Sequence, residues 1–113
     1  MNEKDKRTVK VIISYCERLD KYMVACGNDY EVYLSDSLYR DACALVIIQI
    51  GEFVGRLSDE FRSEFDGVEW RELKGLRNIM AHNYESIIDH IVWDIIQDDI
   101  PEVRQYLEGI LDE

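Results

Sequence analysis

The sequence predicts an all-α protein, an antiparallel bundle of four to five helices. Apolar residues recur at spacings of three and four over most of the chain, and the 113 residues include only one Pro and six Gly. Just one short segment, at 30–34, alternates in the way a strand does. At this length we expect one domain that covers residues 1–113.

The first helix is expected to run from Val9 to Cys26, where apolar residues follow the i, i+3, i+4, i+7 spacing of an amphipathic helix. The turn residues Gly27, Asn28 and Asp29 end it. The next segment, YEVYL at 30–34, alternates like a strand but has no partner strand, and we interpret it as a connector.

The second helix is expected to be the central one. Ser35 or Asp36 can cap its start, and its apolar character continues to residue 61, which predicts a helix over 39–61 that is covered on most sides. Gly51 and Gly55 lie four residues apart within it. In a soluble helix such a pair is typical of a close crossing with another helix.

Three more helical segments complete the bundle. A third helix is predicted over 70–82, where Gly75 suggests close packing because an interior Gly costs about 1 kcal/mol relative to Ala. A fourth begins at a capping box formed by Ser86 and Asp89. The stretch 98–101 is expected to end it and to begin a fifth helix, with Pro near the first position.

The charge of the chain limits how it can meet a nucleic acid. The formal net charge is −11, and nucleic-acid binders ordinarily gain affinity by neutralising phosphates with Lys and Arg. Any contact with RNA must therefore be confined to a small basic or neutral cleft. The acidic surface is equally suited to a basic protein partner.

The three cysteines and the distribution of apolar residues predict the state of the thiols and the location of the protein. Cys16, Cys26 and Cys43 lie among apolar residues without C-x-x-C spacing, so we expect reduced core residues and neither disulfides nor metal ligands. The first ten residues carry charges of both signs, and the longest apolar run, 42–48, is far shorter than the roughly 20 residues of a membrane span. We expect a cytoplasmic protein.

The stretch RNIMAHNY, residues 77–84, is the main candidate for a functional site. His82 can give and take protons near neutral pH, and Arg77 offers a permanently charged fork that fits phosphate oxygens. Asn78 and Asn83 can position a sugar-phosphate backbone. These residue types suffice for RNA cleavage without a metal, in which the neighbouring 2′-hydroxyl attacks phosphorus.

The spacing of Arg77, His82 and Tyr84 in the sequence is compatible with two arrangements of their side chains. On one continuous helix Arg77 and Tyr84 share a face about 10 Å apart, whereas His82 is turned away from Arg77 by roughly 140°. If the helix ends near His82 and Asn83, then His82 and Tyr84 lie in a turn, from which they reach Arg77 or a twin site across a symmetric interface.

A purely structural role is the alternative to a functional site at 77–84. R-x4-H alone is a weak motif, and a His near a helix C-terminus interacts favourably with the helix dipole. The other histidine, His90, is expected to be a surface or half-buried structural residue. The chain has no zinc-binding pattern and no phosphate-binding loop, so we expect no metal and no cofactor.

The stretch also resembles the R-N-x3-H-x-Y signature of the HepT toxins of the HEPN superfamily. Similar elements elsewhere are Y-R-D-A at 39–42, I-G-E at 50–52, the WRELKGLRN entry into the motif and the aliphatic-Trp pair at 92–93, so the likeness covers residues 9–107. The loop before Trp70 lacks the Pro that the family often has there.

The resemblance implies a helical homodimer whose two motifs face one another across a cleft. It implies a metal-independent endoribonuclease acting on tRNA or mRNA, toxic when free, with Arg77 and His82 as catalytic residues. It also implies an MNT-type minimal nucleotidyltransferase as partner and antitoxin, which transfers AMP to Tyr84. The alternative is a noncatalytic partner that docks to the nucleotidyltransferase and binds a nucleotide without cutting RNA.

Overall fold

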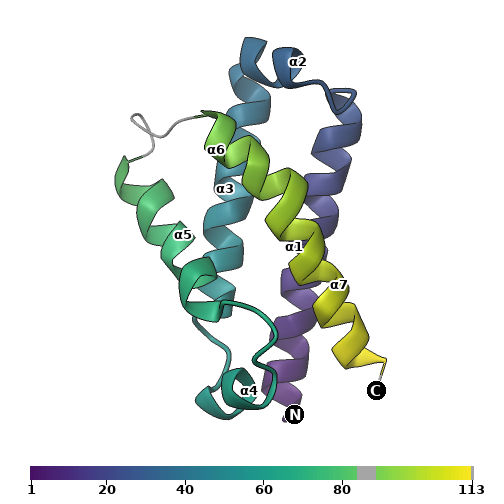
Figure 1. Cartoon of the computed structure of the whole chain (residues 1–113), viewed down its shortest axis with the longest axis vertical. Coiled ribbons are helices and arrows are strands. Elements are labelled where there is room, and N and C mark those ends of the chain that lie inside the picture. Colours follow the sequence, from purple (N-terminus) through teal and green to yellow (C-terminus); the bar gives the residue numbers. More distant parts are fainter. Residues whose placement is uncertain (84–88, 113) are drawn as a thin grey trace.

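The computed structural model describes the backbone of residues 1–83 and 89–112; the side chains of residues 79 and 81–83 lie outside the description. The described chain is all-α and without strands, which confirms the predicted fold class. Four long helical segments alternate in direction (Figure 1). They are α1 (Glu3–Ala25), α3 (Ser37–Val54), α5 (Trp70–Asn83), and a rod made of α6 (Asp89–Asp94), η2 (Ile95–Asp99) and α7 (Ile100–Leu111).

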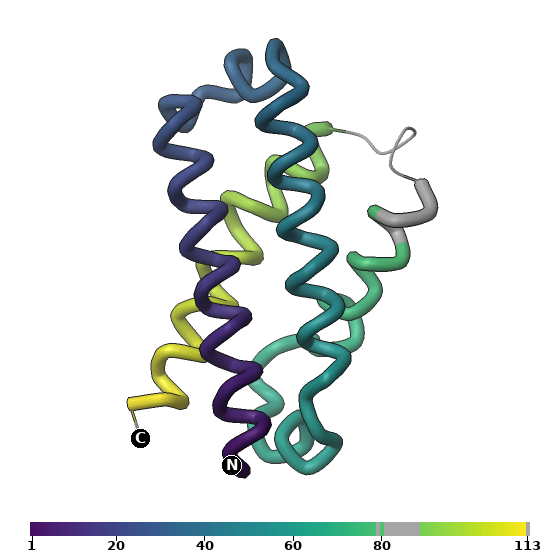
Figure 2. Tube along the Cα trace, turned by 180° about the vertical axis from the view of Figure 1, so that it is seen from behind, coloured from purple at the N-terminus to yellow at the C-terminus, as the bar shows by residue number. Residues whose placement is uncertain are grey.

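The central position of α3 follows from its packing. It packs along α1 on one side and along α5 on the other, and α7 packs on α1. Seen from behind, α1 and α3 lie side by side over most of their length, with α5 beyond α3 (Figure 2). The bundle is elongated, with extents of 43 × 28 × 19 Å.

The segment at 30–34, interpreted from the sequence as a connector, is a short helix, α2 (Tyr30–Ser35). The Asp29 side chain accepts hydrogen bonds from the N–H groups of Glu31 (2.9 Å) and Val32 (3.3 Å), which caps a helix start. Tyr33 is buried, and its ring centroid lies 5.2 Å from that of Trp93. The cap and this burial together outweigh the local alternation.

The central helix ends earlier than predicted, at Val54, and a separate helix α4 (Asp59–Glu64) follows. Asp36, one of the two predicted caps, begins α3 by accepting from the Leu38 N–H. Ser58 caps α4, and its N–H and Oγ both donate to the buried carboxylate of Asp5, at 2.9 and 2.6 Å. The break is therefore held in place by α1, which a pattern local to this segment does not reveal.

The predicted end of the fourth helix at 98–101 is wrong, because the rod continues through the π-helical turn η2 into α7. The N–H of Ile100 donates to the carbonyl of Ile95, and Pro101 then falls in the first turn of α7, where a missing N–H costs little. Within η2, Gln97 donates to the side chain of Asn28 at 2.8 Å. Ser86 of the predicted capping box lies outside the described residues.

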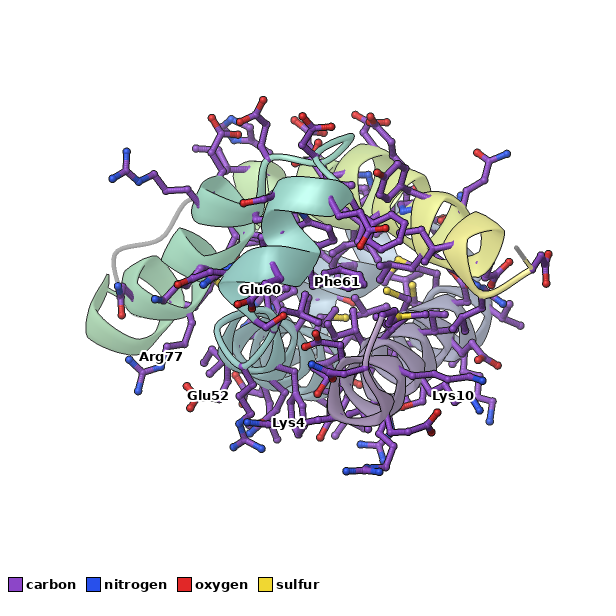
Figure 3. The ribbon with its side chains drawn as sticks, turned by 90° about the horizontal axis from the view of Figure 1, so that it is seen from below. Lys4, Lys10, Glu52, Glu60, Phe61 and Arg77 are labelled. Carbon is purple, nitrogen blue, oxygen red and sulfur yellow. The ribbon has the colours of Figure 1, made fainter. Side chains whose placement is uncertain are left out.

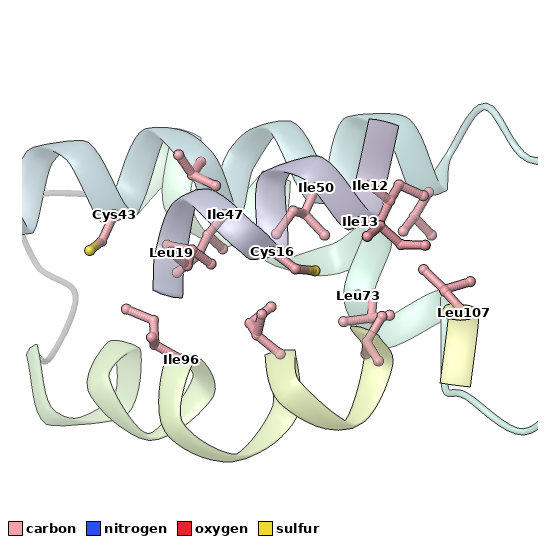
Figure 4. Close-up of a cluster of buried hydrophobic side chains, with 14 of the residues drawn as sticks. Ile12, Ile13, Cys16, Leu19, Cys43, Ile47, Ile50, Leu73, Ile96 and Leu107 are labelled. Carbon is pink, nitrogen blue, oxygen red and sulfur yellow. The ribbon is translucent and has the colours of Figure 1, made fainter. Parts of the chain in front are cut away.

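The core confirms the predicted apolar stripes where the structure describes them (Figure 4). All three cysteines are free and buried, as expected, and burial raises the pKa of the Cys16 and Cys43 thiols to about 12. No helix of the described residues combines the length and the apolar composition of a bilayer span. The buried side chains at the centre include Ile12, Cys16, Leu19, Ile47, Ile50, Leu73, Ile96 and Leu107.

The predicted close crossing is present where α3 meets α5. A Cβ atom built on Gly51 would lie 2.8 Å from Cβ of Arg77 and 3.0 Å from the carbonyl oxygen of Leu73, closer than van der Waals contact permits. Gly75 is different: a Cβ there meets nothing within 4 Å, so the close packing predicted for this residue is wrong. Only the first of these two glycines is required by packing.

This contrast gives a matched test of the crossing. We expect Gly51→Ala to lower the free energy of unfolding by about 1–3 kcal/mol, because the added methyl group pushes α5 away from α3. Gly75→Ala should raise it by up to about 1 kcal/mol, since only helix propensity changes. Urea unfolding followed by circular dichroism measures both. Equal changes in the two variants would contradict a tight crossing at Gly51.

Candidate functional site

The crossing at Gly51 fixes the place of Arg77. Because the Arg77 backbone lies against α3, its side chain leaves the bundle at the edge between the two helices and points toward Glu52 (Figure 3). Its Nε lies 3.0 Å from Glu52 Oε2 in an ion pair, and its Nη1 donates a hydrogen bond to Asn78 Oδ1 at 3.1 Å. Gly51 and Glu52 belong to α3. Arg77 and Asn78 belong to α5, and the fold brings the two pairs together.

The ion pair between Arg77 and Glu52 orients the guanidinium without neutralising it for an incoming anion. The Arg77 side chain is 47% exposed and the Glu52 side chain 41%. Solvent screening limits such a pair to about 1 kcal/mol or less. A guanidinium has five N–H donors, and among the described residues the hydrogen bond to Asn78 uses one of them. The remaining donors can bind the oxygens of a phosphate.

A cleft of about 180 Å³ surrounds this guanidinium, and we call it the Arg77 cleft. It contains three cationic side chains and one carboxylate, which belongs to Glu52. The chain as a whole carries a formal net charge of −11, so this cleft is the local cationic site that a contact with RNA requires. Its lining residues are Gly51, Glu52, Gly55, Arg56, Lys74, Arg77 and Asn78.

The other predicted site residues follow Arg77 along the chain. The backbone of α5 remains helical through His82 and ends at Asn83, but the side chains of both residues lie outside the description, as does the whole of Tyr84. Positions 77 and 82 of a continuous helix are separated by about 140° around its axis. The helical backbone therefore directs Arg77 and position 82 away from each other within one copy of the chain.

The opposite side of α5 has the opposite charge. A groove of about 370 Å³ lies between α5, η2 and α7, and we call it the acidic groove. Burial, together with the neighbouring carboxylates of Asp98 and Glu102, raises the pKa of Asp99. A polyanion is repelled here, and a basic group is attracted. The groove is lined by Gly67, Val68, Glu69, Glu72, Leu73, Leu76, Ile95, Asp99, Glu102 and Val103.

A line of exposed apolar residues on α3 leads to the Arg77 cleft. Leu38 is 68% exposed and Leu45 is 58% exposed. With Glu52 they occur at intervals of seven residues, which places all three along one side of the helix. Two exposed leucines therefore precede the partner of Arg77 on the solvent-facing side of α3, and the exposed Asp41 lies between them in sequence.

Sequence reasoning missed three residues of the Arg77 cleft. Glu52 received no role, although it directly follows the crossing residue Gly51. Lys74 precedes Arg77 by three residues, the spacing that places both on one face of α5. Arg56 comes from the end of α3, and no local signal links it to α5. His90 is exposed on α6, in agreement with the structural interpretation.

Within the part of the chain that the structure describes, no group of three or more His, Cys, Asp or Glu side chains is arranged to hold a metal ion.

The chain is similar to known proteins over most of its length. A family model described as "Ribonuclease HepT-like" matches residues 12–110. "Putative RNase MJ1380" of Methanocaldococcus jannaschii is 32% identical over 71% of this chain and 73% of its own length. "Putative RNase TTE0752" of Caldanaerobacter subterraneus is 31% identical over 88% of each chain. "Probable ribonuclease HepT" of Thermococcus cleftensis is 24% identical over 72% and 74%.

No solved structure matches the chain with significance. The family model spans nearly all of the bundle, from α1 to α7, and includes the whole of the Arg77 cleft. The chain therefore belongs to the HepT-like ribonuclease family of the HEPN superfamily.

Proposed function

We propose that this chain is the toxin of a toxin-antitoxin pair, a metal-independent endoribonuclease that cleaves tRNA or mRNA at the Arg77 cleft. One observation carries the proposal. In a member of a ribonuclease family, the Arg of the R-x4-H motif lies in a cationic cleft on an otherwise acidic chain, oriented by Glu52 and Asn78. Its free N–H donors suit the charge that develops on a phosphoryl group.

The proposed reaction uses groups of the chain and of the RNA alone. The 2′-hydroxyl oxygen forms a bond to the adjacent phosphorus, and the bond from phosphorus to the 5′-oxygen breaks. His82 takes the proton of the 2′-hydroxyl or supplies one to the leaving 5′-oxygen. Arg77 binds the nonbridging oxygens while their charge rises. The products are a 2′,3′-cyclic phosphate and a 5′-hydroxyl end.

Two copies of the chain are needed for this chemistry, because positions 77 and 82 diverge around the axis of α5. The exposed line formed by Leu38 and Leu45 supports a homodimer, since it offers apolar surface beside Glu52. A twofold axis near this line brings two Arg77 clefts together. His82 of one copy then acts on a phosphate bound by Arg77 of the other.

Regulation is proposed to act on Tyr84. An MNT-type nucleotidyltransferase joins the Tyr84 phenolic oxygen to the α-phosphorus of ATP, the bond to the β-phosphate breaks and pyrophosphate leaves. The attached AMP adds a negative charge and a bulky base seven residues after Arg77. Such a group competes with substrate phosphate for the guanidinium and repels RNA.

The acidic groove favours a second candidate function, a noncatalytic partner of the nucleotidyltransferase. Its rim carries Glu69, Glu72, Asp99 and Glu102 around an apolar floor, which is complementary to a basic segment of another protein. In this case Arg77 and Asn78 hold the phosphate of a nucleotide and no RNA is cut. The two candidates differ in whether the chain alone cleaves RNA.

Cleavage of RNA by the purified chain tests the leading proposal. We expect cleavage of total RNA in EDTA, with products ending in 2′,3′-cyclic phosphate. Arg77→Ala and His82→Ala should each slow it by roughly 100-fold or more, because each removes a group that acts in the transition state. Gel analysis of labelled RNA measures the rates. His90→Ala is the matched control, since His90 is exposed on α6, and should cleave like the wild type.

Two results would reject these assignments. If the wild-type chain leaves RNA intact in EDTA and with added divalent metal, it is not the proposed ribonuclease. If RNA is cut but both variants cut it equally well, the activity belongs to other residues.

A substitution of Leu45 on α3 tests the proposed dimer interface. We expect Leu45→Asp to convert a dimer into a monomer and to abolish RNA cleavage, because a charge is placed in the proposed apolar interface. Light scattering coupled to size-exclusion chromatography gives the mass. Val24→Asp is the control, because Val24 is 80% exposed on α1 and lies outside the proposed interface. A Leu45→Asp variant that stays dimeric and active would contradict this interface.

Modification of Tyr84 is tested by intact mass. After coexpression with an MNT-type nucleotidyltransferase, we expect the chain to gain the mass of AMP and to lose its activity on RNA. Tyr84→Phe should gain nothing, whereas Tyr22→Phe, altered on α1, should still be modified. An unchanged mass of the wild-type chain, in a coexpression where the nucleotidyltransferase is active on ATP, would remove this form of regulation.

A further inference from the structure

The Arg77 cleft contains more positive charge than one phosphate requires. Arg77 is paired with Glu52, but neither Lys74 nor Arg56 lies within 4.0 Å of a carboxylate of the described residues. Arg56 instead places its guanidinium 4.3 Å from the ring centroid of Phe53. Two cations that the described part of the fold does not neutralise thus share a cleft with the proposed catalytic Arg.

The floor beneath these two cations is bare backbone. Gly55 lies one helical turn after Gly51 on α3, and both residues line the cleft without a side chain. A Cβ atom on Gly55 would come within 3.5 Å of Cε of Lys74, so the lysine stem extends over this glycine. Gly51 is buried under the backbone of α5, so of the two glycines only Gly55 presents bare backbone to a ligand, beside the lysine stem.

The order along α5 separates these cations from the reacting phosphate. Lys74 lies one turn before Arg77, whereas His82 lies five residues after it. Arg77 therefore stands between Lys74 and the position of the proposed general acid or base. A phosphate bound at Lys74 and Arg56 therefore lies next to the phosphate bound by Arg77, on the side away from position 82 of the same copy.

We propose that Lys74 and Arg56 form a second phosphate subsite, which binds the phosphodiester adjacent to the scissile one in a single-stranded RNA. This rests on the proposed function only for the identification of the phosphate at Arg77 as the scissile one. Binding itself follows from two cations that share one cleft and that no carboxylate of the described residues pairs. Grooves of this kind follow the backbone of a single strand, and the acidic groove on the other side of α5 confines the strand to this side.

The subsite is tested by binding of a labelled single-stranded RNA whose 2′-hydroxyls are all methylated, because such a strand cannot be cleaved. We expect Lys74→Gln and Arg56→Gln each to weaken binding and to reduce the slope of log K against log salt by about 0.7, the value for one lost phosphate contact on a single strand. Fluorescence anisotropy over a salt series measures both. Lys74→Arg should restore the slope, because it restores the charge.

The control is Lys21→Gln, which removes an exposed lysine near the C-terminal end of α1. Its affinity and salt slope should equal those of the wild type. If Lys74→Gln and Arg56→Gln also equal the wild type, the subsite is rejected even when RNA is cleaved. If Lys74→Gln and Arg56→Gln each lose one phosphate contact but the wild-type chain never cleaves RNA, the subsite is confirmed and the proposed ribonuclease function is rejected.

Kinetics and a competing ligand complete the test. With a cleavable RNA we expect Lys74→Gln to raise KM and to leave kcat unchanged, because a flanking phosphate is bound equally in the ground state and in the transition state. A fall in kcat with constant KM would instead make Lys74 part of the reaction.

ATP is the second probe. Saturable binding of ATP that depends on Lys74, without any binding of RNA, would overturn the assignment to a nucleic acid.

Discussion

The contact between Gly51 and the backbone of Arg77 is the constraint on which the rest of the site depends. Only a residue without a side chain allows α3 and α5 to approach this closely, and this approach sets the rotation of α5 in the bundle. With that rotation fixed, Arg77 leaves the helix beside Glu52, and Lys74 extends over Gly55. A single crossing thus determines both the shape and the charge of the cleft.

The same helix separates the charges of the molecule. The side of α5 that faces the end of α3 carries Lys74 and Arg77, while the side that faces α7 carries Glu69 and Glu72. A chain with a formal net charge of −11 can therefore present a local site for a polyanion. The acidic side is left for basic partners, so the overall charge and the proposed activity do not conflict.

The sequence predicted the bundle, the apolar stripes and the crossing because each has a local period or a marker such as Gly51. It failed where a distant residue decides the outcome. Ser58 ends the central helix through hydrogen bonds to Asp5, and Gln97 holds the π turn against Asn28. The cleft shows the same limit. The motif gave Arg77 and Asn78, whereas Glu52 of α3 and Arg56 of the turn after α3 carry no local signal that links them to α5.

A continuous α5 separates positions 77 and 82 by about 140° around its axis, so the proposed reaction centre is shared between two copies. Mixing the inactive Arg77→Ala and His82→Ala chains under conditions of subunit exchange tests it most directly. A shared centre predicts that cleavage returns, since a mixed dimer keeps one intact Arg77 and one intact His82. A mixture that exchanges subunits and yet remains as inactive as either variant alone would contradict the account.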